Sequence, residues 1–566
     1  MGRGSYWNNS AAVKRCICMV AAIWLQSVNG TNFIFSNYSS DLKKTMGINQ
    51  TRLNNLAVAS DLGKFTGWVS GVVSMLFPTW AVLSIAMSLG MVGYGVQWFM
   101  LTQIIGPLAY WQVCMLCFLA GNSICWFNTV SFMAAVGNFP NSRGIASGLS
   151  TSYSGLSAVI YTCLSSVIDP GHPSSYLLLS SVVPAIVALI SAILLHVSQL
   201  KMAKEEEGDK RIMTLFTLIA IVTVIYSILY EFIPHTNRRT EGIYMSVLII
   251  LLLSPLYVPL KLAFGMDATK TTIISNYNSS SRPIQEEHDP KSAERDNSII
   301  HETFQENSIT TQEAIDNTTL DIGLEDQQRA LHRSSPSLGE EHSIKQLLSS
   351  IDFWLYYLVY FCGGTVGLIY INNLGQILQS LGYTKTPILV SLVSSFGFFG
   401  RIASGCPDYI QQWTAFESCR KMPRTAWIAI WMVPMSIAFF MMALLNPMSA
   451  TVLYLSTAIV GTSSGAITSI AIPVSSELFG MEHFAVNHNI VVTNIALGSI
   501  LFGEIAGIIY DSSGKGRHVC IGKQCFHKTF VLWGCVCSFG IILCVILCLR
   551  TRELYESIHR QRQNHN

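Results

Sequence analysis

Two opposite charges lie inside a stretch of sequence that is otherwise apolar. Asp61 and Lys64 fall within the predicted membrane span 55–76, where a charged side chain is costly and normally faces a cavity or a charged partner. A spacing of three residues places both on one face of a helix, close enough to form an ion pair. Such a pair can bind a zwitterion, or Lys64 can meet an anion while Asp61 exchanges a proton. A structural pair that fixes this helix to a neighbour is an equal alternative.

A polar stripe runs along the first predicted span, 15–36. Gln26, Asn29 and Asn32 recur at intervals of three residues, so they share one face of a helix. These side chains are candidates for contacting a solute, and hydrogen bonding between helices is the equal alternative. Asn122 and Asn128, in the span 111–136, are weaker candidates of the same kind.

The second half of the chain offers a sparser set of the same type. Asn372 ends the span 351–372, and Asn494 and Glu504 both lie in the span 487–510. The last two are separated by about 15 Å of helical rise. We expect Glu504 to act as a proton-coupling carboxylate or an external gate, with a structural ion pair as the alternative.

The composition indicates a membrane protein that positions these polar groups on many helices. Of 566 residues, 50% are hydrophobic and only 12% are charged, against about 25% charged residues in a typical soluble protein. A helical span needs about 20 mostly apolar residues. By that measure we predict fourteen spans: 15–36, 55–76, 80–101, 111–136, 144–167, 176–198, 211–233, 243–263, 351–372, 387–404, 425–445, 451–474, 487–510 and 528–549.

These spans divide into two groups of six, with two extra spans and an acidic segment between them. Residues 263–348 contain 15 acidic and 7 basic residues and have no apolar period, which predicts a disordered linker. The expected organisation is a first six-span bundle over 1–200, two extra spans over 201–263, the linker over 264–348, a second six-span bundle over 349–550 and a tail over 551–566. An even number of inserted spans lets both bundles begin on the same side of the membrane.

Most Lys and Arg residues collect on one side of the membrane when both termini are placed in the cytosol, as the positive-inside rule expects. The glycosylation sequons at Asn37 and Asn49 then lie outside the cytosol. Cys520 and Cys525 also fall outside it, where a disulfide and two free thiols are equal alternatives. We expect a multi-pass protein of the plasma membrane or an endomembrane.

One motif at the end of a span suggests the fold. Gly400, Arg401, Gly405 and Asp408 form the pattern G-R-x-x-x-G-x-x-D, which resembles a cytoplasmic-loop motif of the major facilitator superfamily. The Arg and the Asp can bond each other or cap a neighbouring helix end, and we interpret the four residues as the latch of a cytosolic gate. The corresponding loop of the first half, near Phe77, has no charged counterpart.

Several local strings narrow the resemblance to a family. Asp61-Leu62-Gly63-Lys64, Asn138-Phe139-Pro140 and Ser476-Glu477-Leu478-Phe479-Gly480 look like the plant nodulin-like, nuclear-fusion-defective-type membrane proteins of that superfamily. The resemblance implies an all-α multispan carrier with two six-helix bundles. It does not imply a substrate.

We therefore expect a secondary active transporter that moves a small polar or anionic solute by alternating access, coupled to protons. The alternative is a non-transporting scaffold or receptor that recruits protein partners through the acidic linker. The sequence shows no metal-ligand spacing, phosphate loop or nucleophile–base set, so we expect no enzyme, no cofactor and no nucleic-acid partner. The expected partners are the solute, protons and the lipid bilayer.

Overall fold

The computed structural model describes residues 2–198, 209–231, 238–264, 336–382, 386–413, 422–444, 450–513 and 520–564. Residues up to Ala263 and from Leu338 onward form one compact unit, and the description below concerns that unit. Most of the predicted linker, 265–335, lies outside the described residues. Its last part does not: residues from Leu338 to the helix α14 (Ile344–Ser349) pack on the second bundle.

Twelve helices in the described part of the chain are long and apolar enough to cross a membrane. Each overlaps one of the fourteen predicted spans, although the bounds differ: the span predicted to end at Asn372 continues to Ser380. The other two predicted spans, 55–76 and 144–167, are helical too, but each is divided into shorter segments. The first comprises α3 (Gln50–Phe65) and α4 (Trp68–Leu76), and the second comprises α7 (Arg143–Ser152), a 3-10 turn over Tyr153–Leu156 and α8 (Ser157–Ile168).

The first bundle also contains four long helices and a short one. These are α1 (Gly2–Asn29), α2 (Phe35–Met46), α5 (Thr79–Leu101), α6 (Tyr110–Asn138) and α9 (Ser174–Ser198). The two extra spans follow as α10 (Asp209–Glu231) and α11 (Arg238–Leu253). They share one apolar core with the first bundle, in which Phe216 and Tyr230 pack with residues of α1 and α6.

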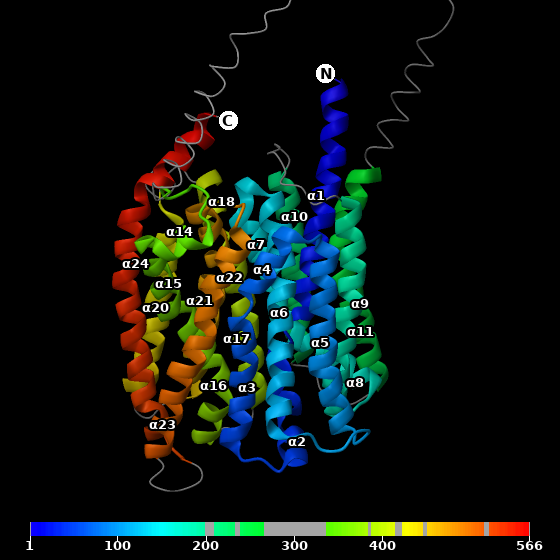
Figure 1. Cartoon of the computed structure of the whole chain (residues 1–566), viewed down its shortest axis with the longest axis vertical. Helices are drawn as coiled ribbons and strands as arrows, with labels where there is room; N and C mark the ends of the chain where they lie inside the picture. Colours follow the sequence, from blue (N-terminus) through cyan, green and yellow to red (C-terminus); the bar gives the residue numbers. More distant parts are fainter. Residues whose placement is uncertain are drawn as a thin grey trace, which may run out of the picture. The chain divides into compact units, whose positions relative to one another are not determined.

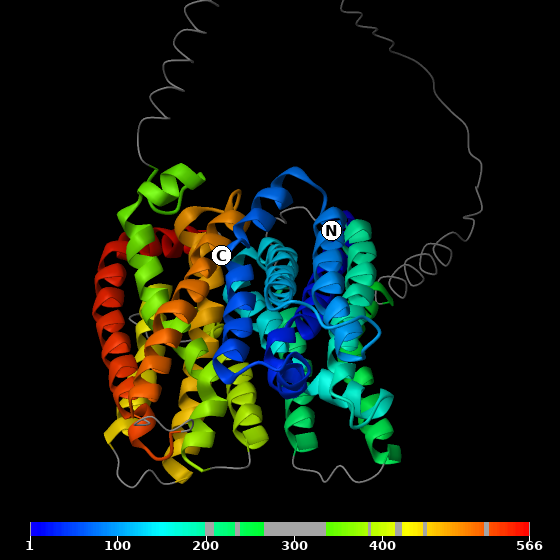
Figure 2. The same ribbon diagram turned by 60° about the horizontal axis from the view of Figure 1, so that its bottom comes forward.

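The second bundle is built from α15 (Ile351–Tyr360), α16 (Val366–Ser380), α17 (Thr386–Ala403), α18 (Cys406–Trp413), α20 (Arg424–Leu444), α21 (Ala450–Phe479), α22 (Phe484–Gly498), α23 (Glu504–Ser513) and α24 (Gln524–Asn564). Its core is separate and aromatic, with Trp533, Phe439 and Tyr370 in mutual ring contact. Figure 2 shows this bundle beside the first one, in orange and red against blue and cyan.

The two ends of the helical unit carry different elements (Figure 1). We call the upper end, where α1 begins and α24 ends, the termini face. We call the lower end, which carries α2, α23 and the disulfide Cys520–Cys525, the disulfide face.

Two spans of the second bundle change from α-helix to π-helix for one turn. The turns are Phe361–Thr365, between α15 and α16, and Ser499–Gly503, between α22 and α23. The two turns lie against each other, because the rings of Phe361 and Phe502 are 5.0 Å apart. Thr365 Oγ1 of the first turn also donates a hydrogen bond at 2.5 Å to Asn494 Oδ1, which lies in α22 before the second turn. Single π-helical turns of this kind often occur at functional sites.

Candidate functional site

The predicted pair Asp61–Lys64 is formed and lies where the two bundles meet. Lys64 Nζ donates to Asp61 Oδ1 at 2.6 Å, and the two residues are only 6% and 8% exposed. The other carboxylate oxygen, Oδ2, accepts hydrogen bonds from the second bundle: from Ser499 Oγ at 2.6 Å and from Asn372 Nδ2 at 3.4 Å. Asp61 thus joins an intrabundle ion pair to an interbundle contact.

A cavity of about 640 Å³ opens beside Asp61 between the bundles. First-bundle residues of its wall include Asn32, Tyr94 and Gln97, and the second bundle contributes Asn372 from α16 and Ser391 from α17. The lining also includes Tyr38, which lies on α2 at the disulfide face. The cavity therefore extends from the buried pair toward that face.

The break between α3 and α4 helps to place the pair. The Gly63 carbonyl accepts hydrogen bonds from the Thr66 hydroxyl, at 3.0 Å, and from Asn122 Nδ2, at 2.9 Å. These side-chain donors compete with the backbone donors that would continue the helix. Asn122 Oδ1 also accepts a bond from Trp126 Nε1, so this candidate supports the break and does not line the cavity.

The other polar candidates of the first bundle bond to each other. Asn128 Oδ1 accepts a bond from Gln26 Nε2 at 2.9 Å and from Asn29 Nδ2 at 2.8 Å, and Asn29 also donates to the Ile124 carbonyl. The structure thus brings Gln26, Asn29 and Asn128 together as a link between α1 and α6. Asn32 is different, because it lines the cavity.

Of the second-bundle candidates, one lines the cavity and two do not. Asn372 reaches both Asp61 and the cavity. Asn494 is fully buried, where it accepts from Thr365 and donates to the Tyr357 carbonyl. Glu504 is the first residue of α23 and is exposed, and it is not among the residues that line the cavity beside Asp61.

Asp408 forms a buried charge cluster at the termini face. Its Oδ1 accepts from Arg424 Nη2 at 2.6 Å, and Arg424 also donates to Glu477 through Nε and Nη2, at 2.9 to 3.2 Å. The second oxygen, Asp408 Oδ2, accepts from the backbone N–H of Ile145 at 3.1 Å. Because Ile145 lies in the first turn of α7, the carboxylate caps a first-bundle helix at its positive end.

The rest of the predicted latch packs between helices. A Cβ added to Gly400 would lie 2.0 Å from the Thr462 carbonyl, and one added to Gly405 would lie 3.0 Å from Ile145 Cα, so both glycines permit close helix contacts. Arg401 does not pair with Asp408. Its guanidinium lies over Gly155 of the first bundle, and the partner of Asp408 is Arg424.

Uncharged contacts join the bundles elsewhere toward the termini face. Asn489 Nδ2 donates to Thr129 Oγ1 at 2.7 Å and to Ser70 Oγ at 3.3 Å. The hydroxyls of Thr151 and Ser469 lie 2.7 Å apart. A Cβ on Gly71 would lie 2.6 Å from the backbone of Val486. We call these contacts and the Asp408 cluster together the termini-face seal.

The end of the central segment is fastened to the same seal. The Gly339 and His342 N–H groups donate to the carbonyls of Leu478 and Phe479. The Glu341 carboxylate accepts from the N–H groups of Met481 and Glu482 at 2.7 and 2.8 Å. We call residues 338–343 the strap. It holds the turn that follows Glu477 and precedes α22, and that turn connects Glu477 to the seal residues of α22.

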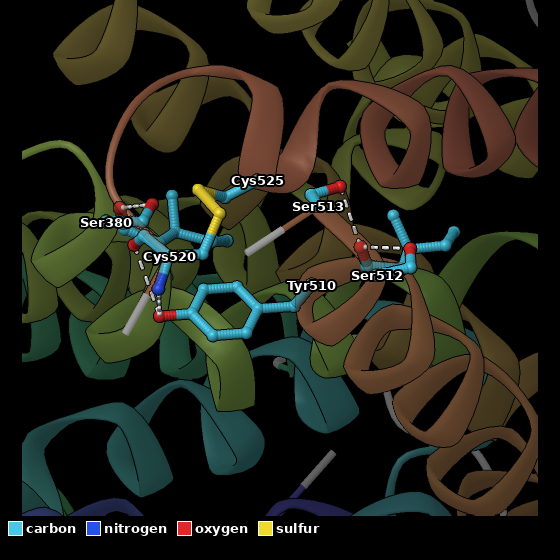
Figure 3. The surroundings of a disulfide bond; sticks show 8 residues. Ser380, Tyr510, Ser512, Ser513, Cys520 and Cys525 are labelled. Atoms are coloured by element: carbon cyan, nitrogen blue, oxygen red, sulfur yellow. Dashed lines mark hydrogen bonds between the residues drawn. A yellow bond between two sulfur atoms is a disulfide. The ribbon is translucent and has the colours of Figure 1, made fainter. Parts of the chain in front are cut away.

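Cys520 and Cys525 form a disulfide at the opposite end (Figure 3). The Tyr510 hydroxyl accepts from the Cys520 N–H at 3.1 Å, and the Gly522 N–H donates to the Ser380 carbonyl at 2.7 Å. The loop is therefore attached to both α23 and α16. The two sequon residues are exposed at this face: Asn37 lies in α2 and Asn49 caps α3 by accepting from the Arg52 N–H.

Three contacts were not predicted from the sequence: Ser499 with Asp61, Asn489 with the first bundle, and Arg424 with Glu477. Ser499 and Asn489 are common polar residues inside apolar spans, and nothing in their spacing points to a partner in the other bundle. Arg424 and Glu477 carried a weak signal, because each is a charge at the end of a span. Their 53-residue separation hides the pairing.

Comparisons with known proteins agree with these features. Residues 15–260 match the family model described as Nodulin-like, and residues 337–557 match the model described as NFD4, C-terminal domain. The chain is 39% identical to Protein NUCLEAR FUSION DEFECTIVE 4 of Arabidopsis thaliana over 96% of its own length and 90% of that protein. It is 25% identical to Probable transporter mch1 of Emericella nidulans over 35% of this chain and 37% of that protein.

Among solved structures, the chain resembles the major facilitator superfamily proton:xylose symporter XylE with a TM-score of 0.53 and 9% identity, covering 94% of this chain and 95% of that one. A likeness at this identity shows the fold alone. The predicted fold and the predicted family resemblance are both confirmed. The chain is an integral multi-pass membrane protein with the major facilitator fold, and it belongs to the nodulin-like family.

Proposed function

We propose that this protein is a secondary active transporter that moves a small polar or anionic solute by alternating access. The observation that carries the proposal is a cavity of about 640 Å³ between two bundles, open toward one face and separated from the other face by the termini-face seal. Two bundles that rock about a central site expose it to each side in turn. The name of the Emericella nidulans relative, Probable transporter mch1, supports the same class.

The termini face lies in the cytosol in this proposal. The excess of Lys and Arg in the loops on that side supports the assignment. The disulfide at the opposite face supports it as well, because the cytosol is reducing. The structure then corresponds to a state with its cytosolic side closed.

Asp61 is the proposed coupling group. Its carboxylate receives Lys64 from its own bundle and Ser499 and Asn372 from the other. Protonation removes the negative charge and weakens all three interactions, since bonds to an ionised acceptor are about twice as strong as those between neutral groups. A proton on Asp61 would therefore loosen the two bundles from each other, which links proton uptake to rocking.

Uptake into proteoliposomes tests the proposal. The purified protein is reconstituted, an inward proton gradient is imposed, and a panel of radiolabelled polyols, amino acids and organic anions is supplied. Asp61→Asn and Lys64→Ala are expected to lose gradient-driven uptake of the transported solute while the protein still folds.

The chain provides a matched control in Asp41 and Lys44, an exposed pair with the same spacing on α2. Asp41→Asn and Lys44→Ala should transport normally. Full uptake by both Asp61→Asn and Lys64→Ala would show that the buried pair is structural, and the lack of any transported solute across the panel would count against the transporter itself.

A further inference from the structure

The charges around the cavity are balanced within the protein. Asp61 is the single residue with a side chain charged at neutral pH among the described residues that line the cavity. Lys64 neutralises it at 2.6 Å and is not part of the lining. The second oxygen of Asp61 is occupied by Ser499 and Asn372. A charged solute would therefore leave water without meeting an opposite charge, which is costly.

The polar groups that remain free are hydroxyls and amides. Asn32 and Thr162 of the first bundle, and Ser391 and Ser394 of the second, line the cavity and make no side-chain hydrogen bond to any described residue. Each is partly buried. Hydroxyl and amide groups both donate and accept, so this lining matches a solute that also carries hydroxyls.

Aromatic rings complete the wall. Phe33, Phe35 and Tyr38 follow Asn32 closely in the sequence, and their rings line the cavity near the disulfide face. Rings of this kind cover the apolar C–H faces of a solute while its hydroxyls bond elsewhere. The volume lies within the usual range of about 300–1,000 Å³ for small-molecule sites.

We propose that the cavity binds an uncharged, polyhydroxylated solute, held between Asn32 and Thr162 on one bundle and Ser391 and Ser394 on the other. The proposal rests on the transport function proposed above and narrows its substrate class. It favours a neutral polyol over the anion and the zwitterion, because neither end of the Asp61–Lys64 pair is free to receive a charge.

Three six-carbon probes that differ only at one terminal group provide the test. D-sorbitol ends in a neutral hydroxymethyl group, gluconate in a carboxylate and D-glucamine in an ammonium group. Binding is measured as the rise in Tm of the purified full-length protein with probe concentration. We expect D-sorbitol to bind at least tenfold more tightly than either charged probe.

Two variants assign the binding to the cavity. Ser391→Ala with Ser394→Ala should weaken D-sorbitol binding about tenfold, as expected for two lost hydrogen bonds. Ser395→Ala, on the same helix but not in the lining, is the matched control and should bind normally. Gly375→Trp should abolish binding without strain, because a Cβ there meets no atom within 4 Å and the residue lines the cavity.

Polyols also raise the Tm of proteins without binding to a specific site. Gly507→Trp measures that general effect for comparison with Gly375→Trp, because Gly507 is similarly unobstructed and is not among the cavity-lining residues. The proposal is overturned if gluconate or D-glucamine binds more tightly than D-sorbitol, if all three fail to bind, or if Gly375→Trp responds like wild type. Uptake of a different solute that Gly375→Trp blocks would keep the transport function while rejecting the polyol.

Discussion

Asp408 accepts the backbone N–H of Ile145 at 3.1 Å across the boundary between the two bundles. The same carboxylate is paired with Arg424, and the whole cluster is buried. A helix cap supplied by the opposite bundle can persist only while that side is closed. The bond is therefore a direct structural marker of the closed termini face.

Asp408→Asn should shift the protein toward states that are open at the termini face. Breaking one partner of a buried ion pair costs about 3–5 kcal/mol, and much of that cost falls on the sealed state, where the cluster is formed. Hydrogen–deuterium exchange of peptides from α7 and the start of α22 should accelerate by at least tenfold.

The control for this change is Asp352→Asn. Asp352 pairs with Arg550 inside the second bundle, and the Arg550 side chain is 47% exposed, so its loss should cost about 0–1 kcal/mol. Equal exchange rates in Asp408→Asn and wild type would show that the cap does not hold the seal.

Arg424→Met should destabilise the folded protein more than any single change to its partners. It leaves Asp408 and Glu477 as two buried carboxylates without a cation, at a cost of about 3–5 kcal/mol. The Tm of the purified protein should fall by several degrees, and expression should drop with it.

A neutral triple variant separates charge from packing. Combining Arg424→Met with Asp408→Asn and Glu477→Gln removes every charge of the cluster, so no carboxylate is left buried without a cation. We expect the Tm of the triple variant to recover much of the loss. A triple variant less stable than Arg424→Met alone would mean that the hydrogen bonds matter more than the charge balance.

Glu341→Ala should release the strap without unfolding the bundle. Its carboxylate accepts hydrogen bonds from two backbone N–H groups of the turn before α22, and a hydrogen bond contributes roughly 1 kcal/mol. Exchange in residues 338–343 and 480–484 should rise several-fold while the rest of α21 is unchanged. Lys345→Ala, an exposed position four residues further on, is the control and should exchange like wild type.

Replacing Cys520 and Cys525 by Ser should cost about 2 kcal/mol, the loop-entropy estimate for so short a ring. The loss should be local, because the Tyr510 and Ser380 contacts hold the loop independently. Increased exchange confined to residues 520–526 would support this; a collapse of Tm by tens of degrees would contradict it.

The sequence was sufficient for the fold because length and hydropathy locate the spans, and the spacing of Asp61 and Lys64 correctly predicts an ion pair. The alternatives for Asp408 were also resolved: it caps a neighbouring helix end and does not pair with Arg401. What the sequence could not show is which bundle each polar side chain faces. Asn29 and Asn372 are the same residue type in similar surroundings, yet one bonds inside its bundle and the other reaches the opposite bundle.

The π-helical turn before α16 determines which side chains of that helix face the cavity. A π-helical turn contains an extra residue, so conversion of Phe361–Thr365 to an α-helix would rotate α16 by about 100° relative to α15. That rotation would carry Asn372 away from Asp61. Because Thr365 bonds to Asn494 and Phe361 lies against Phe502, a change of phase in one span disturbs the other. Rotation about a helix axis, as well as rocking of the bundles, can therefore change which groups the solute meets.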